Sequence, residues 1–291
     1  MPNINIHGLV KKRTLTEAEA TAIEQLRTTC NNYERLHMRI DVGALSKRPA
    51  NEANDFLYYE DGILVGYLFV ESWGSGDQEI GGMIHPDYRR RGIFSSLLAA
   101  AMDECRQRDV QKLILICEHF SQSGLAFVHS IKAQLEYSEH EMVLGTFLER
   151  RKVHKGLNIR QANRQDLEAI VSILATDSGN VESISQWVAK LFEESTSCFY
   201  LATLEEKPLG CLRLDFMSDQ VGIYAFEVRL GYRGLGYGRQ ILEEAIRTIR
   251  SESQKRIMLD VETDNTNAIG LYLSCGFEIK TTYDYYNLNI S

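Results

Sequence analysis

The segment Tyr232–Leu242, YRGLGYGRQIL, places three glycines directly before a run with helical spacing. The first turn of a helix has backbone N–H groups without partners and a partial positive charge, so a helix that follows a tight loop can bind an anion. Glycines let a phosphate approach this backbone without meeting a Cβ atom. The spacing therefore predicts a phosphate-binding loop.

The spacing of the glycines distinguishes between the known kinds of phosphate-binding loop. A dinucleotide-binding GxGxxG pattern starting at Gly234 needs a third glycine at position 239, which is Arg239. The Gly-Lys-Ser/Thr of a nucleotide P-loop is also absent. Arg233 to Gly238 instead reads R-x-x-G-x-G, between a predicted strand and a predicted helix.

The loop belongs to an internal repeat with an offset of 144 residues, which indicates two copies of one domain. We place the copies at residues 1–150 and 151–291, joined near the basic, polar segment 148–158. The matching pairs are Gly66 with Gly210, Tyr88 with Tyr232, Arg89 with Arg233, Gly92 with Gly236, and Leu98 with Leu242.

Hydrophobic periodicity predicts the elements that hold the loop in place. Each copy is expected to be a mixed sheet with helices on both faces. The second copy is predicted to have strands at 157–162, 221–230 and 256–263, a hairpin at 198–216, terminal strands within 277–290, and helices at 166–176, 184–194, 238–252 and 267–274. The first copy is predicted to have a helix at 15–29, a hairpin at 56–70, strands at 78–85 and 112–118, and a helix at 95–107.

The loop and the downstream segment NTNAIGLYLSCGFE, residues 265–278, together resemble the GNAT superfamily of acetyl-CoA-dependent N-acyltransferases. The resemblance covers nearly the whole chain, twice. It implies an α/β fold of two tandem GNAT (acyl-CoA N-acyltransferase) domains, each a mixed, mostly antiparallel sheet flanked by helices. It also implies acetyl-CoA (coenzyme A) as co-substrate and no metal.

The resemblance assigns cofactor contacts to the loop and to the strand before it. The loop amides would hold the pyrophosphate of CoA, and the strand would pair with its pantetheine arm. The residues carried over are Val228 and Arg229 for the pantetheine and thioester, Arg233, Gly234, Leu235, Gly236, Tyr237, Gly238 and Arg239 for the pyrophosphate, Asn265 in the second motif, and Arg89 and Gly92 in the first copy.

The second motif, N-x-x-A-x-x-L-Y from Asn265 to Tyr272, has local and functional interpretations that are compatible. Asp264 or Asn265 is a good helix N-cap, and Gly276 suits the left-handed residue after a helix. The resemblance implies that Tyr272 lies beside the CoA sulfur and protonates the leaving thiolate. With ordinary pKa values of about 10 for a phenol and about 8.5 for a thiol, this transfer is feasible in a desolvated site. The alternative is a tyrosine that only packs on the cofactor.

The implied reaction is direct attack of a neutral amine on the thioester carbonyl, with an amide near Val228 stabilising the oxyanion. All seven histidines precede residue 155, so we expect no histidine base in the second copy. The base is then a carboxylate, a water chain or a group from the other copy. The candidate carboxylates are Glu227, Asp260 and Glu262, the last two on one strand face, although each also fits a solvated or structural carboxylate. An acyl-enzyme route through Cys275 lacks a histidine partner.

The first copy lacks the proposed acid, because the offset places Val128 where the second copy has Tyr272. Ser121 replaces Asn265, and Phe94 replaces a loop glycine. We therefore predict a catalytic second copy and a degenerate first copy, which is a structural partner or holds CoA without turnover. This layout resembles tandem GNAT enzymes of the mycothiol synthase kind, which does not define the substrate.

Composition limits the partners. A net charge of −8 over 291 residues argues against nucleic acid and weakly favours cationic partners. No signal peptide or membrane-spanning run is present, which predicts no membrane partner and a cytoplasmic location. The six cysteines show no disulfide or zinc spacing, and we interpret them as buried thiols.

The acceptor and the assembly stay open. We expect a small-molecule amine or a peptide acceptor, and a monomer or a homodimer. The tail residues Tyr283, Asp284, Tyr285 and Tyr286 could form an aromatic and acidic wall for a cationic amine, or could simply suit a pleated strand. A non-catalytic acyl-CoA sensor and a scaffold of two inactive domains are the alternative functions.

Overall fold

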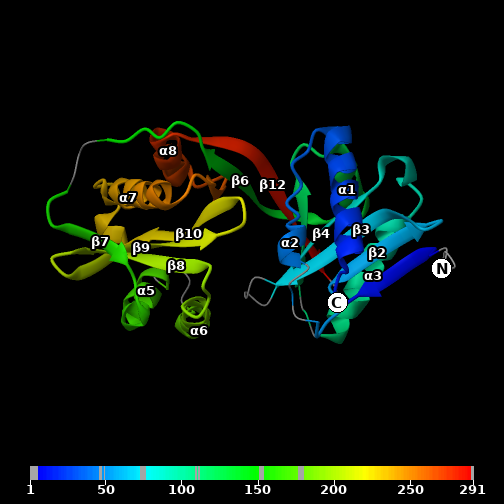
Figure 1. Cartoon of the computed structure of the whole chain (residues 1–291), viewed down its shortest axis with the longest axis horizontal. Helices are drawn as coiled ribbons and strands as arrows, with labels where there is room; N and C mark the ends of the chain where they lie inside the picture. The colour runs from blue at the N-terminus through cyan, green and yellow to red at the C-terminus, as the bar shows by residue number, and fades with distance from the viewer. Residues whose placement is uncertain are drawn as a thin grey trace. The chain divides into compact units, whose positions relative to one another are not determined.

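The computed structural model describes residues 6–45, 48, 50–72, 77–108, 110, 112–150, 154–175 and 180–289. The chain forms two compact units, coloured in chain order in Figure 1. Unit 1 comprises Met1–Ser138 and Thr281–Ser291, and unit 2 comprises Glu139–Lys280. The chain thus leaves unit 1 near residue 138 and returns near residue 280, whereas the sequence predicts one boundary at about 150.

Unit 1 contains a sheet ordered β1-β2-β3-β4-β5-β12. Only β4 and β5 among these neighbours run parallel. Separate buried clusters hold α1 and α2 on one face and α3 and α4 on the other. Its elements are β1 (Gly8–Lys12), α1 (Glu17–Glu34), α2 (Val42–Leu45), β2 (Asp55–Glu60), β3 (Ile63–Ser72), β4 (Gln78–Ile84), η1 (Pro86–Tyr88), α3 (Ile93–Gln107), β5 (Lys112–Glu118), α4 (Gln122–Ser130) and the end of β12 (Phe277–Asn289).

Unit 2 repeats this plan, with a sheet ordered β6-β11-β10-β9-β8-β7. Figure 1 shows α7 and α8 on one face of this sheet and α5 and α6 on the other. Its elements are β6 (Gln134–Leu144), β7 (Leu157–Gln161), η2 (Arg164–Asp166), α5 (Leu167–Leu174), α6 (Val181–Leu191), β8 (Ser197–Leu204), β9 (Lys207–Phe216), β10 (Gln220–Val228), η3 (Leu230–Tyr232), α7 (Tyr237–Glu252), β11 (Arg256–Glu262) and α8 (Thr266–Cys275). None of the helices described in either unit is long and apolar enough to cross a membrane.

The last strand of each repeat explains why the units do not divide at residue 150. Residues 139–143 of β6 pair with β11 of unit 2, although β6 ends the first repeat. Residues 283–289 of β12 pair with β5 of unit 1, although β12 ends the second. The tail is one long strand rather than several. The four tail residues Tyr283, Asp284, Tyr285 and Tyr286 belong to unit 1 rather than to unit 2.

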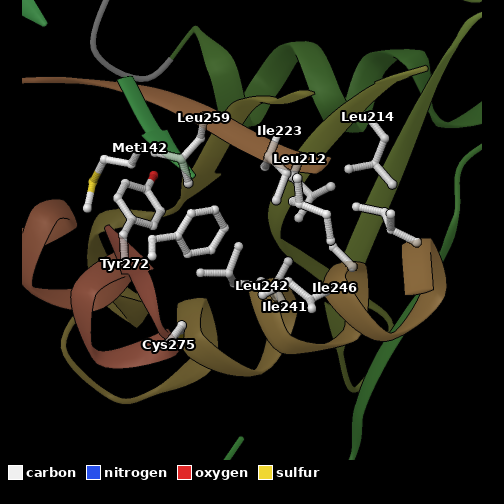
Figure 2. Close-up of a cluster of buried hydrophobic side chains, with 14 of the residues drawn as sticks. Met142, Leu212, Leu214, Ile223, Ile241, Leu242, Ile246, Leu259, Tyr272 and Cys275 are labelled. Atoms are coloured by element: carbon white, nitrogen blue, oxygen red, sulfur yellow. The ribbon is translucent and has the colours of Figure 1, made fainter. Parts of the chain in front are cut away.

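Equivalent glycines in the two units confirm the repeat in three dimensions. A Cβ atom on Gly66 of β3 would lie 3.2 Å from Leu97 of α3. A Cβ atom on Gly210 of β9 would lie 3.0 Å from Ile241 of α7. Leu97 and Ile241 are also 144 residues apart, so each glycine lets the helix after the loop pack against the sheet. Figure 2 shows the resulting core in unit 2, with side chains from β9, β10, β11, α7 and α8.

Candidate active site

The glycine loop has the same backbone conformation in both units. In unit 2, Gly234 and Gly236 have φ values of 74° and 94°. In unit 1, Arg90 and Gly92 have φ values of 62° and 78° at the equivalent positions. The first helical bond of α7 runs from Gln240 N to the carbonyl of Gly236, so the preceding amides have no acceptor within the helix. This geometry fits an anion in both units.

The loop of unit 2 has room for a ligand at two of its glycines. A Cβ atom added at Gly234 would meet nothing within 4 Å. One added at Gly238 would make only ordinary contacts, the nearest at 3.6 Å to Val228. The chain therefore leaves the backbone of this loop accessible, as an approaching phosphate requires.

A histidine that the sequence interpretation did not assign to the second copy lies against its loop. The Nε2 atom of His154 is 2.9 Å from the position of a Cβ atom on Gly236, and its ring centroid is 4.5 Å from that of Tyr237. Its amide donates to Gln240 Oε1 at 2.8 Å. Unit 2 also includes His140 of β6, so unit 2 contains two histidines, although the sequence interpretation expected no histidine base in the second copy. Nothing in the local sequence marks His154, because its contacts form across more than 80 residues.

The loop arginines fix the strand to the loop rather than pointing into it. Arg233 donates from Nε to the carbonyl of Val228 at 2.7 Å and pairs with Glu227 at 2.5 Å. Arg89 repeats this arrangement, donating from Nε to the last carbonyl of β4 at 3.1 Å and pairing with Glu34. In both units this guanidinium is hydrogen-bonded and ion-paired within the protein, so phosphate binding would depend on the backbone amides of the loop.

The side chain of Arg239 also has a structural role. Its guanidinium donates to the carbonyl of Ser274 at 3.2 Å, to Cys275 Sγ at 3.3 Å, and to Glu243 at 3.3 Å. The Glu243 side chain is 3% exposed, which makes Arg239 its buried counterion. The side chain of Arg239 therefore binds the end of α8, and only its backbone remains near the loop.

The strands β10 and β11 separate close to the loop. They pair in parallel only from Gln220 to Ile223. Beyond this point the register of β10 against β9 shifts between Tyr224 and Glu227, and Ala225 has a φ of 46°. This β-bulge changes the direction in which the following side chains of β10 point. The pairing of β3 with β4 in unit 1 is continuous, so the bulge distinguishes the two copies.

Tyr272 lies beside this opening. Its side chain belongs to the core between the sheet and α8, and its ring centroid is 6.4 Å from that of Phe226 in the bulge. Figure 2 shows its hydroxyl pointing from α8 toward the sheet. Burial, with a smaller contribution from Glu227, raises the pKa of Tyr272 to about 12. The phenol therefore holds its proton at neutral pH.

The strand amides assigned to the thioester are hydrogen-bonded within the protein. Val228 N donates to Glu227 Oε1 at 2.9 Å, and Arg229 N donates to the carbonyl of Leu209 at 2.9 Å. An oxyanion at Val228 would have to replace the carboxylate of Glu227. The carboxylate of Glu227 thus lies beside the amide that the sequence interpretation assigns to the oxyanion.

Asp260 and Glu262 lie on the face of β11 opposite Tyr272. The intervening residue Val261 belongs to the same core as Tyr272, and strand alternation turns its neighbours to the other face. There Asp260 is opposite Glu141 of β6, and Glu262 is opposite a second β6 glutamate. Burial and neighbouring carboxylates raise the pKa of Glu262. The structure thus puts the candidate acid and two candidate bases on opposite faces of the opening.

The local interpretation of the second motif is confirmed. Asn265 Oδ1 accepts from Ala268 N at 3.1 Å as the N-cap of α8, and Gly276 ends the helix with a φ of 100°. Ser121 repeats this cap in unit 1, accepting from Gly124 N at 3.1 Å. The side chain of Asn265 is therefore used by the helix.

Two other chemistries have little support in the described parts of the chain. No group of three or more His, Cys, Asp or Glu side chains there could hold a metal ion. Burial raises the pKa of the Cys275 thiol, which disfavours the thiolate that an acyl-enzyme route needs. All six cysteines are free, and five are buried.

Unit 1 contains a cleft of about 820 Å³. It includes the loop residues Arg89, Arg90 and Gly92, and it extends along β4 and β5 to the end of α1. Val128, the counterpart of Tyr272, is also part of its wall. The first copy therefore has a large cleft at its loop.

Comparisons with known proteins agree on the family. The sequence model of the acetyltransferase (GNAT) family matches residues 20–129 and 166–277. A mycothiol acetyltransferase of Kineococcus radiotolerans is 27% identical over 246 residues, covering 77% of this chain and 78% of that protein. The N-alpha-acetyltransferase 30 of Saccharomyces cerevisiae is 28% identical over 148 residues, covering 46% of this chain and 81% of the yeast protein.

Solved structures show the same fold over nearly the whole chain. A GCN5-related N-acetyltransferase from Sphaerobacter thermophilus gives a TM-score of 0.81 at 16% identity, covering 97% of this chain and 96% of that one. A tandem GNAT protein from the clavulanic acid biosynthesis pathway gives 0.70 at 17% identity, covering 97% and 98%. With one family match in each repeat, the chain belongs to the GNAT acetyltransferase family as a tandem member with two GNAT domains.

Proposed function

We propose that the second copy transfers the acetyl group of acetyl-CoA to a primary amine by direct attack. The observation that carries this proposal is the position of Tyr272, buried beside the opening between β10 and β11 and next to the bulge. The first copy has neither the tyrosine nor the bulge. The GNAT family supplies the expectation of acetyl-CoA as the donor.

In this proposal the loop binds the donor and Tyr272 supplies the proton. The free first-turn amides of α7 and the accessible backbone at Gly234 and Gly238 fit a pyrophosphate. The raised pKa of Tyr272 keeps its phenol protonated, so it can donate to the leaving sulfur in a desolvated site.

The base comes from the opposite face. Glu227, Asp260 and Glu262 approach the opening there, and the acidic surface of β6 and β11 suits a cationic amine. Glu227 is the strongest candidate by position, because its carboxylate lies at the amide of Val228, which is assigned to the oxyanion. A substrate ammonium could give its proton to this carboxylate while the amide becomes available to the oxyanion.

The test is acetylation of a panel of primary amines, with release of free thiol and mass of the product as readouts. Tyr272→Phe should lower kcat by about 100- to 10,000-fold with little change in KM for acetyl-CoA. Tyr200→Phe is the matched control, since Tyr200 is also a tyrosine of unit 2, partly buried, but lies on β8, which β9 separates from β10. Unchanged turnover in Tyr272→Phe would rule out Tyr272 as the general acid. If the chain acetylates none of the amines, the proposed activity is contradicted.

A further inference from the structure

The cleft of unit 1 passes through its sheet. Its walls include Ile93, Leu115 and Val128 from the core on the α3 face, and Phe69 and Met83 from the core on the α1 face. The passage exists because β4 and β5 pair only over residues 78–80 and 113–115 and then separate. A ligand held by the loop can therefore extend through the sheet to the α1 side.

The end of the cleft on the α3 face suits phosphate. The loop there keeps the backbone conformation of the second copy, with Gly92 as N-cap of α3. Arg90 of the loop is exposed and forms part of the wall. The cleft thus starts at free amides and a positive charge.

The end on the α1 face is an apolar chamber, with walls that are mostly buried. Two of its residues are methionines, whose flexible side chains adapt to ligands of irregular shape. The residues of the chamber are Leu36, Met38, Ile40, Phe69, Met83 and Tyr283.

The charges around the apolar chamber do not suit an amine. Glu118 accepts from His37 N at 2.6 Å and from Thr281 Oγ1 at 3.0 Å. The other carboxylate of the wall, Glu34, pairs with a loop arginine. The guanidinium of Arg39 lies 4.4 Å from the centre of the Tyr283 ring, so a positive charge also lies at the wall of the chamber. An ammonium group would find no uncommitted carboxylate among these residues, whereas an uncharged chain needs none.

We propose that unit 1 binds a CoA thioester with an acyl chain longer than acetyl, with the chain in the apolar chamber, and does not transfer it. The loop would hold the phosphates, and the thioester would lie where β4 and β5 separate. Val128 cannot donate a proton to a leaving thiolate there. The inference shares with the proposed function only the assignment of CoA phosphates to the glycine loops.

The test is calorimetric titration of the full chain with CoA, acetyl-CoA and octanoyl-CoA. Gly236→Trp blocks the loop of unit 2, so any binding measured in this variant occurs in unit 1. Gly92→Trp blocks the loop of unit 1, so any binding measured in it occurs in unit 2. In Gly236→Trp we expect octanoyl-CoA to bind at least about tenfold more tightly than acetyl-CoA, because buried methylenes add affinity. Gly92→Trp should lose this preference.

Filling the apolar chamber is the specific control. Met83→Trp, made in the Gly236→Trp background, should abolish the preference for the longer chain and keep affinity for CoA within about threefold. If Met83→Trp does not fold, Met38→Trp makes the same test from a half-buried position. Equal affinities for the two thioesters, no CoA binding by Gly236→Trp, or a preference that survives chamber filling would overturn the inference. If Gly236→Trp shows no preference for octanoyl-CoA while the parent chain shows Tyr272-dependent acetylation, this inference alone is refuted. If Gly236→Trp shows the preference but the parent chain acetylates no amine, only the proposed function is refuted.

Discussion

Replacement of Gly236 by alanine tests the contact between the glycine loop of unit 2 and His154. Gly236 has a φ of 94°, a left-handed conformation that costs a residue with a Cβ atom about 1–2 kcal/mol. The new Cβ atom would also lie 2.9 Å from His154 Nε2, so the imidazole must move. Moving it disrupts its packing on Tyr237, which contributes about 1 kcal/mol. Gly236→Ala should therefore lower the free energy of unfolding by about 2–3 kcal/mol.

Two matched variants separate the contributions. Gly92→Ala has the same kind of strain, with a φ of 78°, but its Cβ atom would meet nothing within 4 Å. It should cost only about 1–2 kcal/mol. Gly236→Ala made in a His154→Ala background should cost the same smaller amount, because the ring is gone.

The assay is urea unfolding of the four proteins of the Gly236 and His154 cycle, with Gly92→Ala alongside. Both residues of the cycle belong to unit 2, so one transition reports them. If Gly236→Ala costs the same with and without the His154 ring, the imidazole does not press on the loop and this reasoning is refuted.

Three other substitutions test the site. Burial, followed by two neighbouring carboxylates, raises the pKa of Glu262 above 4.5, so the folded state holds this proton more tightly than the unfolded state. The free energy of unfolding should therefore fall as pH rises through the range just above 4.5. Glu262→Gln should remove this fall when unfolding is measured as a function of pH, and an unchanged profile would contradict the assignment. Arg239→Ala should cost about 3–5 kcal/mol in denaturant unfolding, because it leaves Glu243 buried without a counterion, and a loss below about 1 kcal/mol would reject that structural role. Gly276→Ala should lower Tm sharply, since its Cβ atom would overlap the carbonyl oxygen of Thr146, and a Tm within a few degrees of the parent would show that the helix end is misplaced.

The repeat and its local motifs could be predicted because they depend on a few neighbouring residues. Glycine spacing before α7 located the loop, and the positive φ values of Gly234 and Gly236 show why glycine stands there. Asn265 and Gly276 cap α8 as predicted, because a cap depends on residues within one turn. The offset of 144 residues gave the two domains and the loss of Tyr272 in the first copy.

Contacts between distant segments could not be read from spacing. The position of His154 on the loop, the bulge at Ala225, and the use of Arg239 to bind Glu243 and the end of α8 are all of this kind. Each depends on which surfaces meet after folding, and a pattern of residue types does not encode that pairing.

By itself the sequence determined the family, the tandem order, the position of the glycine loops and the copy that carries the candidate acid. Only the tertiary structure decided that β12 completes the sheet of unit 1, that the candidate acid and bases lie on opposite faces of β10 and β11, and that unit 1 keeps an open cleft. The physical reason is that caps and glycine turns are fixed by local backbone preferences. Strand register and cavity shape are fixed by packing between residues that can be more than 100 positions apart.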